Sequence, residues 1–205
     1  MKILLTGFEP FAQWKVNPSE QIVRALAKSQ PSDYALIAEI LPVDYVQAGS
    51  RIKLLIQKHK PDAVLCLGLA PERRSLSLER VALNLDDAPL PDNSGRVRIG
   101  RHILHDGPAA YYSTHPLNKL LSAFINKNLP ATTSNHAGTY LCNHVFYLAR
   151  HEIERMGLPS PCGFIHLPGM PSARGKQKRL TLRDMTKAIE LCLDALSRSR
   201  KRPIP

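Results

Sequence analysis

Apolar and polar positions repeat in two ways along the first seventy residues, with strand-like runs separated by stretches of helical spacing. Apolar runs at 2–6, 34–43 and 63–67 predict three strands, the last of them buried on both faces. The stretches 19–26 and 44–60 carry apolar side chains on one helical face. This alternation predicts an α/β fold with a mostly parallel sheet and right-handed crossovers.

The remaining chain continues the pattern less regularly. The loops after Gly7 and Gly68 should lie at the same edge of the sheet, where the carboxyl ends of parallel strands place ligand sites. Thr181, with Asp184 three residues later, can cap a last helix. Further strands are predicted at 76–84, 131–134 and 162–168, a hairpin through Val97–Ile99, and helices over 109–127 (interrupted near Pro116), 142–156 and 181–198.

Length and composition predict a single globular domain. The chain has 205 residues, of which 43% are hydrophobic and 22% charged, and no repeat or linker divides residues 1–205. No apolar run approaches the ~20 residues that span a bilayer. The start is too short and too soon acidic for a signal peptide, so a cytoplasmic location is expected. Residues 199–205 are expected to form a frayed basic tail.

The formal net charge of +11 raises the question of nucleic-acid binding. Ten Lys and Arg residues against three Asp and Glu lie in 172–205, so most of the excess is at the carboxyl end. Basic tails are most often solvated surface, and nucleic-acid binding is therefore disfavoured. The sequence leaves open the role of the basic loop at 174–179 and of the tail.

The cysteines differ in their surroundings, and only Cys142 suggests chemistry. Cys66, Cys162 and Cys192 lie in apolar runs, which is typical of small buried residues, and the four cysteines contain no CxxC pair. Cys142 stands at the start of a predicted helix. Unpaired backbone N–H groups and the helix dipole there favour a thiolate and can hold an oxyanion. We therefore take Cys142 as a candidate nucleophile.

A cysteine nucleophile needs a base and a group that orients the base. His166 ends an apolar strand and is the best-placed base. Glu79 lies among apolar neighbours on a predicted strand, where a carboxylate needs a partner, and it is the natural third member. Taken alone, each is more often a structural residue.

The sequence supports a metal site or a nucleotide-binding site less than it supports a cysteine nucleophile. A zinc site from His136, Cys142 and His144 lacks a fourth ligand, and His102 with His105 lacks further ligands. His144 is also expected to point away from Cys142 on the helix. Only single glycines occur where a phosphate-binding loop would need several.

Four blocks of sequence together resemble one known family of cysteine peptidases, the type I pyroglutamyl peptidases, also called pyrrolidone-carboxylate peptidases. In chain order the blocks are Thr6–Phe11 with Asn17–Ser19, Glu79–Asn84 with Pro91–Asn93, Ala137–His144, and Gly163–Pro168.

The resemblance implies an enzyme that removes an N-terminal pyroglutamyl residue from peptides through a thioester. It assigns Cys142 as nucleophile, His166 as general base and Glu79 as orienting group. It further implies an α/β/α sandwich, a homotetramer, and no metal or organic cofactor. The lactam ring would be bound by Phe8 and Phe11, with Asn17 nearby. From composition alone these aromatics, with Trp14, could equally pack under their loop.

The chain departs from the family pattern near the expected site. Pro89 replaces an arginine that is frequent in the family, so Arg73, Arg74 or the backbone would have to support the oxyanion. The turn before Arg73 is Ala70-Pro71-Glu72, without the usual glycine, and Pro171–Ala173 replaces Pro-Glu-Gln. The alternative is a catalytically impaired homologue that acts as a basic binding or scaffold protein.

Overall fold

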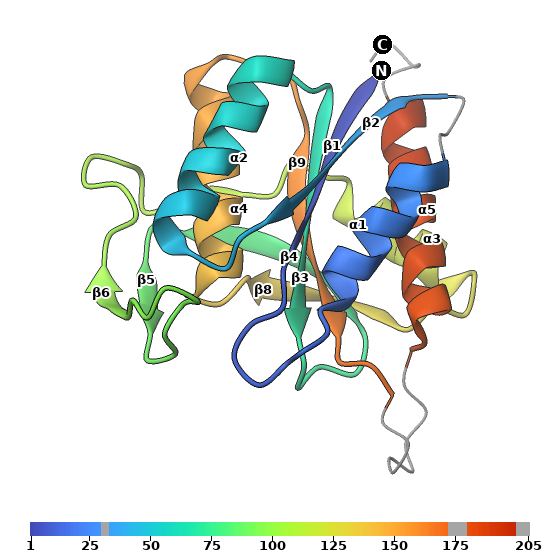
Figure 1. Ribbon diagram of the computed structural model, residues 1–205. Coiled ribbons are helices and arrows are strands. Elements are labelled where there is room, and N and C mark those ends of the chain that lie inside the picture. Colours follow the sequence, from blue (N-terminus) through green and yellow to red (C-terminus); the bar gives the residue numbers. More distant parts are fainter. Residues whose placement is uncertain (30–32, 172–179, 200–205) are drawn as a thin grey trace.

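The protein is a three-layer α/β/α sandwich (Figure 1), seen in a computed structural model that describes residues 1–29, 33–171 and 180–199. Helices α2 and α4 cover one face of the central sheet, and α1, α3 and α5 cover the other. The basic loop at 174–179 and the tail at 200–205 lie outside the described residues. The strands are β1 (Lys2–Phe8), β2 (Ala35–Leu41), β3 (Ala63–Ala70), β4 (Leu76–Leu83), β5 (Asp86–Ala88), β6 (Arg98–Arg101), β7 (Ala110–Tyr112), β8 (Ala131–His136) and β9 (Cys162–Pro168). The helices are α1 (Pro18–Ser29), α2 (Tyr45–His59), α3 (Leu117–Ile125), α4 (Leu141–Arg155) and α5 (Leu182–Ser199).

The central sheet confirms the predicted parallel arrangement and adds an antiparallel boundary. Its order is β2-β1-β3-β9-β4-β7, with β8 also paired to β4. Strands β2, β1, β3 and β9 are mutually parallel, whereas β4 runs antiparallel to β9. The predicted hairpin is the separate antiparallel pair β5–β6. The carboxyl ends of β1, β3 and β9 therefore share one edge, as expected.

Two apolar cores hold the layers together, one on each face of the sheet. Alternate residues of β3 divide between them: Leu65 and Leu67 pack against α1 and α5, while Val64 and Cys66 pack toward α2 and α4. Every residue of β3 is buried, which explains its continuous apolar sequence. Cys66, Cys162 and Cys192 are fully buried free thiols, as predicted. None of the helices within the described ranges is both long and apolar enough to cross a membrane.

Side-chain caps fix the ends of two helices. The Asp44 carboxylate accepts hydrogen bonds of 2.8 Å from the backbone N–H groups of Val46 and Gln47, at the start of α2. At the start of α5, Thr181 and Asp184 bond to each other's backbone N–H groups, which confirms the predicted cap.

The prediction of a helix from residue 109 was wrong for its first part. Residues 110–112 form β7, which pairs antiparallel with the edge of β4. The backbone bonds from Asn84 N–H to Ala109 O (2.8 Å) and from Ser113 N–H to Arg80 O (2.7 Å) extend this ladder. Pairing with an open strand outweighed the local helical pattern, and helix α3 begins only after Pro116.

Candidate active site

Cys142 is the second residue of α4, whose N-cap residue is Tyr140. Its sulfur packs on Gly68 of β3, so closely that a Cβ atom on Gly68 would lie 2.6 Å from Sγ. Gly68 is paired in register with His166 of β9. The absence of a side chain at Gly68 therefore lets the thiol lie against β3, next to the strand that carries His166.

A cavity of about 240 Å³ opens above these residues. It is bounded by the loops after β1 and β3, the hairpin region and the start of α4, which meet at one end of the sheet (Figure 1). The residues that line it are Phe11, Trp14, Leu69, Ala70, Pro71, Glu72, Arg73, Leu90, Ala137, Gly138, Thr139, Tyr140, Cys142 and His166.

His166 is held by a carboxylate on the neighbouring antiparallel strand. Its Nδ1 lies 2.7 Å from Oε1 of Glu79, which is fully buried. The guanidinium of Arg73 donates to the same oxygen. Burial opposes the charge, but the hydrogen bond and charge of His166, with Ser134 and Arg73, bring the pKa of Glu79 below its ordinary value. Glu79 is thus an ionised buried acceptor, and it directs the other ring nitrogen, Nε2, away from itself.

The surroundings of the Cys142 thiol oppose its ionisation. Burial, with the negative charge of Glu79, raises the pKa of Cys142 to about 12, and Arg73 offsets this only in part. The helix N-terminus favours a thiolate, as expected from the sequence, whereas loss of solvation between β3 and α4 acts in the opposite direction.

Two kinds of group could stabilise an oxyanion in this cavity. The first-turn amides of α4 have no acceptor within the helix, and its N-cap residue Tyr140 makes no side-chain capping bond. Arg73 lines the cavity, whereas Arg74 is exposed and does not. Pro89 is exposed, and its neighbour Leu90 reaches the cavity instead.

The three expected substrate-binding residues occupy different positions. Phe11 lines the cavity, while Phe8 and Asn17 are buried beside it and do not. Asn17 donates to Glu9 O (3.0 Å) and accepts from Ser19 N–H (3.1 Å). It therefore holds the loop that carries Phe11.

Several residues that sequence reasoning left without a role tie the cavity walls together. Glu9 Oε1 accepts hydrogen bonds from Val43 N–H (2.9 Å) and from the Asn93 side chain (2.8 Å). Asp92 accepts one from Tyr45 N–H (3.0 Å). These bonds join three separate loops. The only signal in the sequence is that their polar side chains fall within the blocks shared with the family.

The remaining histidines near Cys142 have other partners. The buried His144 places Nδ1 2.9 Å from Oδ2 of Asp86, which also accepts from Arg98 (2.7 Å). His136 Nδ1 accepts from Gly138 N–H (3.1 Å). No group of three His, Cys, Asp or Glu side chains in the described ranges is arranged to hold a metal ion.

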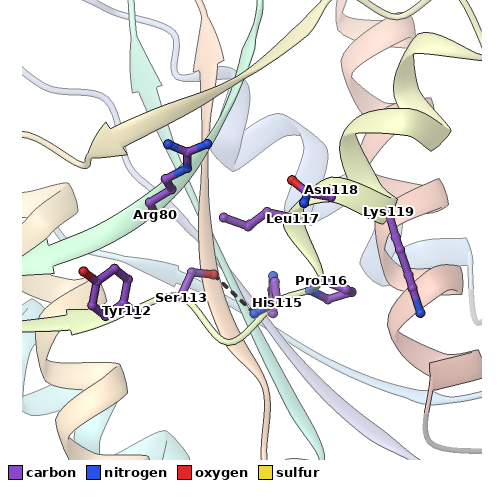
Figure 2. A pocket seen from close by; sticks show the side chains of 8 residues that line it. All are labelled: Arg80, Tyr112, Ser113, His115, Pro116, Leu117, Asn118 and Lys119. Atoms are coloured by element: carbon purple, nitrogen blue, oxygen red, sulfur yellow. Dashed lines mark hydrogen bonds between the residues drawn. The ribbon is translucent and has the colours of Figure 1, made fainter.

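A second hollow, of about 510 Å³, lies between β4, β7 and the start of α3 and shares no lining residue with the first (Figure 2). Arg80 and Lys119 stand on opposite sides of it, and Ser113 accepts a hydrogen bond from His115 N–H (3.3 Å). Burial lowers the pKa of His115 to about 4, so this histidine is neutral. It contributes no charge to the hollow.

Fold and cavity together define the class, a cysteine hydrolase built on an α/β/α sandwich. A family model described as pyroglutamyl peptidase matches residues 1–198. The chain therefore belongs to the pyroglutamyl peptidase family, which confirms the resemblance read from the four sequence blocks.

Individual relatives match most or nearly all of the chain. The pyrrolidone-carboxylate peptidase of Oceanobacillus iheyensis is 41% identical over 197 residues, which cover 95% of this chain and 98% of the relative. That of Pyrococcus furiosus is 40% identical over 171 residues, 83% of this chain and 82% of its own. The crystal structure of Bacillus amyloliquefaciens pyroglutamyl peptidase I superposes with a TM-score of 0.90 at 34% identity, covering 96% of this chain and 97% of that one.

Proposed function

We propose that this chain removes N-terminal pyroglutamyl residues from peptides, with Cys142, His166 and Glu79 as its catalytic residues. The observation that carries the proposal is the 2.7 Å bond between His166 and the buried Glu79, in the cavity that also holds the Cys142 thiol. Family membership supplies the substrate class. The alternative of a basic scaffold protein has no specific observation in its favour among the described residues.

The reaction begins with transfer of the Cys142 thiol proton to His166. His166 Nδ1–H donates to Glu79, so Nε2 accepts the thiol proton as Sγ attacks the carbonyl carbon that follows the pyrrolidone ring. The oxyanion is received by the first-turn amides of α4. The imidazolium then protonates the amine nitrogen, and the C–N bond breaks. The shortened peptide departs, and a pyroglutamyl thioester remains on Cys142.

Hydrolysis of the thioester repeats these steps with water. Neutral His166 takes a proton from water, the hydroxide attacks the thioester carbonyl, and the thiolate leaves and is reprotonated. Glu79 stabilises the imidazolium in both halves, because its pKa is held low and it stays ionised. No metal or organic cofactor takes part in this scheme.

The lactam is uncharged and nearly flat, which suits the aromatic side of the cavity. Phe11 and Tyr140 supply apolar walls with ring centroids 6.3 Å apart. Phe8 and Asn17 act through the loop that they hold. When another N-terminal residue is bound, the polar groups of a site shaped for a cyclic amide lack hydrogen-bond partners. The site therefore disfavours such residues.

We further propose a cytoplasmic homotetramer of single-domain chains, as the family resemblance implies. All four cysteines are free, as is usual in a reducing compartment. Val97 and Ile99 of the hairpin region, and Val46 and Leu54 of α2, expose about half of their apolar surface and could be covered by another copy. Light scattering on the purified chain tests the stoichiometry.

The activity is tested with a pyroglutamyl-linked fluorescent amine. Wild-type protein should release the amine, while Cys142→Ser and Cys142→Ala should remove the activity without lowering the melting temperature. Cys192→Ala, in the opposite core, is the matched control and should retain turnover. If both Cys142 variants stay active, the assigned nucleophile is wrong; a folded wild-type protein with no turnover argues for the scaffold alternative.

A further inference from the structure

We propose that Trp14 forms the subsite for the residue that follows the pyroglutamyl group, and that it favours bulky apolar side chains there. The inference rests on the proposed function and concerns the leaving peptide. Trp14 lines the same cavity as Cys142 and is half-buried. Neither the reaction scheme nor the lactam pocket uses its indole ring.

The aromatic rings beside the cavity form a row that runs from the interior to the surface. Its inner end is Tyr45, whose side chain is 1% exposed, and the next ring is Tyr140, with centroids 5.7 Å apart. Phe11 follows at 6.3 Å, and Trp14 follows Phe11 at 5.0 Å. Tyr140, Phe11 and Trp14 line the cavity together with Cys142, whereas Tyr45 does not. Trp14 is therefore the cavity-lining ring at the end of the row opposite the buried Tyr45.

The backbone holds Trp14 in this place at a cost in strain. Trp14 N–H donates to Phe11 O (3.0 Å) and closes a tight turn. Within that turn Ala12 has φ +49°, the left-handed region that a residue with a Cβ atom rarely adopts. Strained turns of this kind cluster at ligand sites, where they fix a side chain that flexible chain would not hold.

The chemistry places the leaving amine beside His166, which lines the same cavity as Trp14. His166 must protonate the departing amine, so the amine and its side chain lie next to His166. The loop from Pro71 to Arg73 runs along this side of the cavity and ends in the Arg73–Glu79 ion pair. Because β1 and β3 are adjacent and parallel, this loop and the Trp14 turn leave the sheet side by side.

The surface that these two loops offer is apolar at its centre and charged at its margin. The indole of Trp14 and the ring of Pro71 both line the cavity, while the Glu72 side chain is 73% exposed and paired with Arg73 at 3.9 Å. A leucine or phenylalanine side chain would bury apolar surface against the two rings, whereas glycine has no side chain to bury there. A contact of this size changes kcat/KM by about tenfold or more.

The test measures kcat and KM for pyroglutamyl dipeptide amides whose second residue is Gly, Ala, Leu, Phe or Asp. For the wild type, kcat/KM with Leu and Phe should exceed that with Gly by about tenfold. Trp14→Ala should bring this ratio close to one, chiefly through KM, because the contact exists before the transition state. Trp14→Phe should restore most of the preference. Val16→Ala, on the same loop but outside the cavity lining, is the matched control and should keep the wild-type ratio.

The outcomes separate this inference from the proposed function. Turnover without preference, or a Trp14→Ala variant that slows all five substrates equally, overturns the subsite and leaves the peptidase assignment intact. A folded wild type that cleaves none of the five overturns the proposed function and the subsite with it. Melting temperatures of all variants show whether a lost preference reflects lost structure.

Discussion

The sulfur of Cys142 occupies the space that a side chain on Gly68 would fill. A Cβ atom there would lie 2.6 Å from Sγ and 2.7 Å from the ring of Phe164; the buried Phe164 cannot retreat, so the sulfur would be displaced toward the cavity. Gly68 is therefore required for the position of the thiol beside His166, and not for backbone flexibility. Its sequence neighbours gave no sign of this, because a glycine in an apolar strand has many explanations.

Gly68→Ala is expected to lower kcat/KM by about 100-fold or more, because a shift of about 1 Å in the nucleophile is enough for such a loss. Gly163→Ala is the matched control on the next strand. Its Cβ atom would meet His115 at 2.5 Å, so it should cost about 1–3 kcal/mol of stability and leave the turnover of folded protein intact. Equal activity losses in both variants would show that overpacking of the sheet, and not displacement of the thiol, is responsible.

Alkylation of Cys142 by iodoacetamide is expected to quicken with pH throughout the range from 6 to 9. The pKa of this thiol is raised to about 12, so the thiolate fraction grows about tenfold per pH unit below that value. Peptide mapping by mass spectrometry follows the modification, with the fully buried Cys192 as the slow internal reference. A rate that levels off near pH 6–7 would instead indicate a thiolate–imidazolium pair in the resting enzyme.

Glu79→Gln is expected to reduce kcat/KM by about 100-fold or more, because the His166 imidazolium loses its counter-charge. The stability difference from wild type should also depend on pH. The pKa of Glu79 is lower in the folded chain than its ordinary 4.5, so its stabilisation is complete above that value and is lost as the pH falls through the lowered pKa.

Urea unfolding of both proteins between pH 7 and pH 3 measures this difference. Glu20→Gln, which removes only a surface pair with Arg24, serves as the control and should show little pH dependence. A constant gap between wild type and Glu79→Gln at all pH values would contradict an ionised Glu79.

His115 is expected to make the fold sensitive to mild acid. Its folded pKa of about 4 lies below its ordinary 6.5, so the unfolded chain binds a proton between these values that the folded chain does not. Stability should be unaffected above pH 6.5 and should fall by about 3 kcal/mol as the pH drops to 4.

His115→Gln should flatten this part of the pH profile, whatever its effect at pH 7. His105→Gln is the control, because His105 is 95% exposed and should leave the slope as it is. An unchanged slope in His115→Gln would place the acid sensitivity in other groups.

Local patterns predicted most of the helices and strands, because the apolar periodicity of each segment matches the face that it buries. The start of α5 followed from the Thr181–Asp184 spacing, and β3 from an apolar run too regular for a loop. Residues 110–112 are the exception, because their strand partner β4 is distant in sequence. The local sequence at 110–112 does not indicate that β4 has an open edge for pairing.

The features of the site also divide into those that the sequence could predict and those that it could not. Cys142, His166 and Glu79 could be proposed from residue type, position and family blocks. The pairing of Arg73 with Glu79 and the contact of Gly68 with Cys142 could not, since they depend on the register of strands far apart in the chain.

The boundary between the parallel strands and β4 has a consequence for how the enzyme loses activity on heating. His166 and Gly68 lie on two central strands and Glu79 on the third, so we expect their backbone amides to exchange hydrogen only on global unfolding. The loops with Phe11 and Trp14 lie outside these strands. Gentle heating should therefore weaken binding of the peptide while the reacting groups stay in place. Inactivation should be reversible until the sheet itself unfolds.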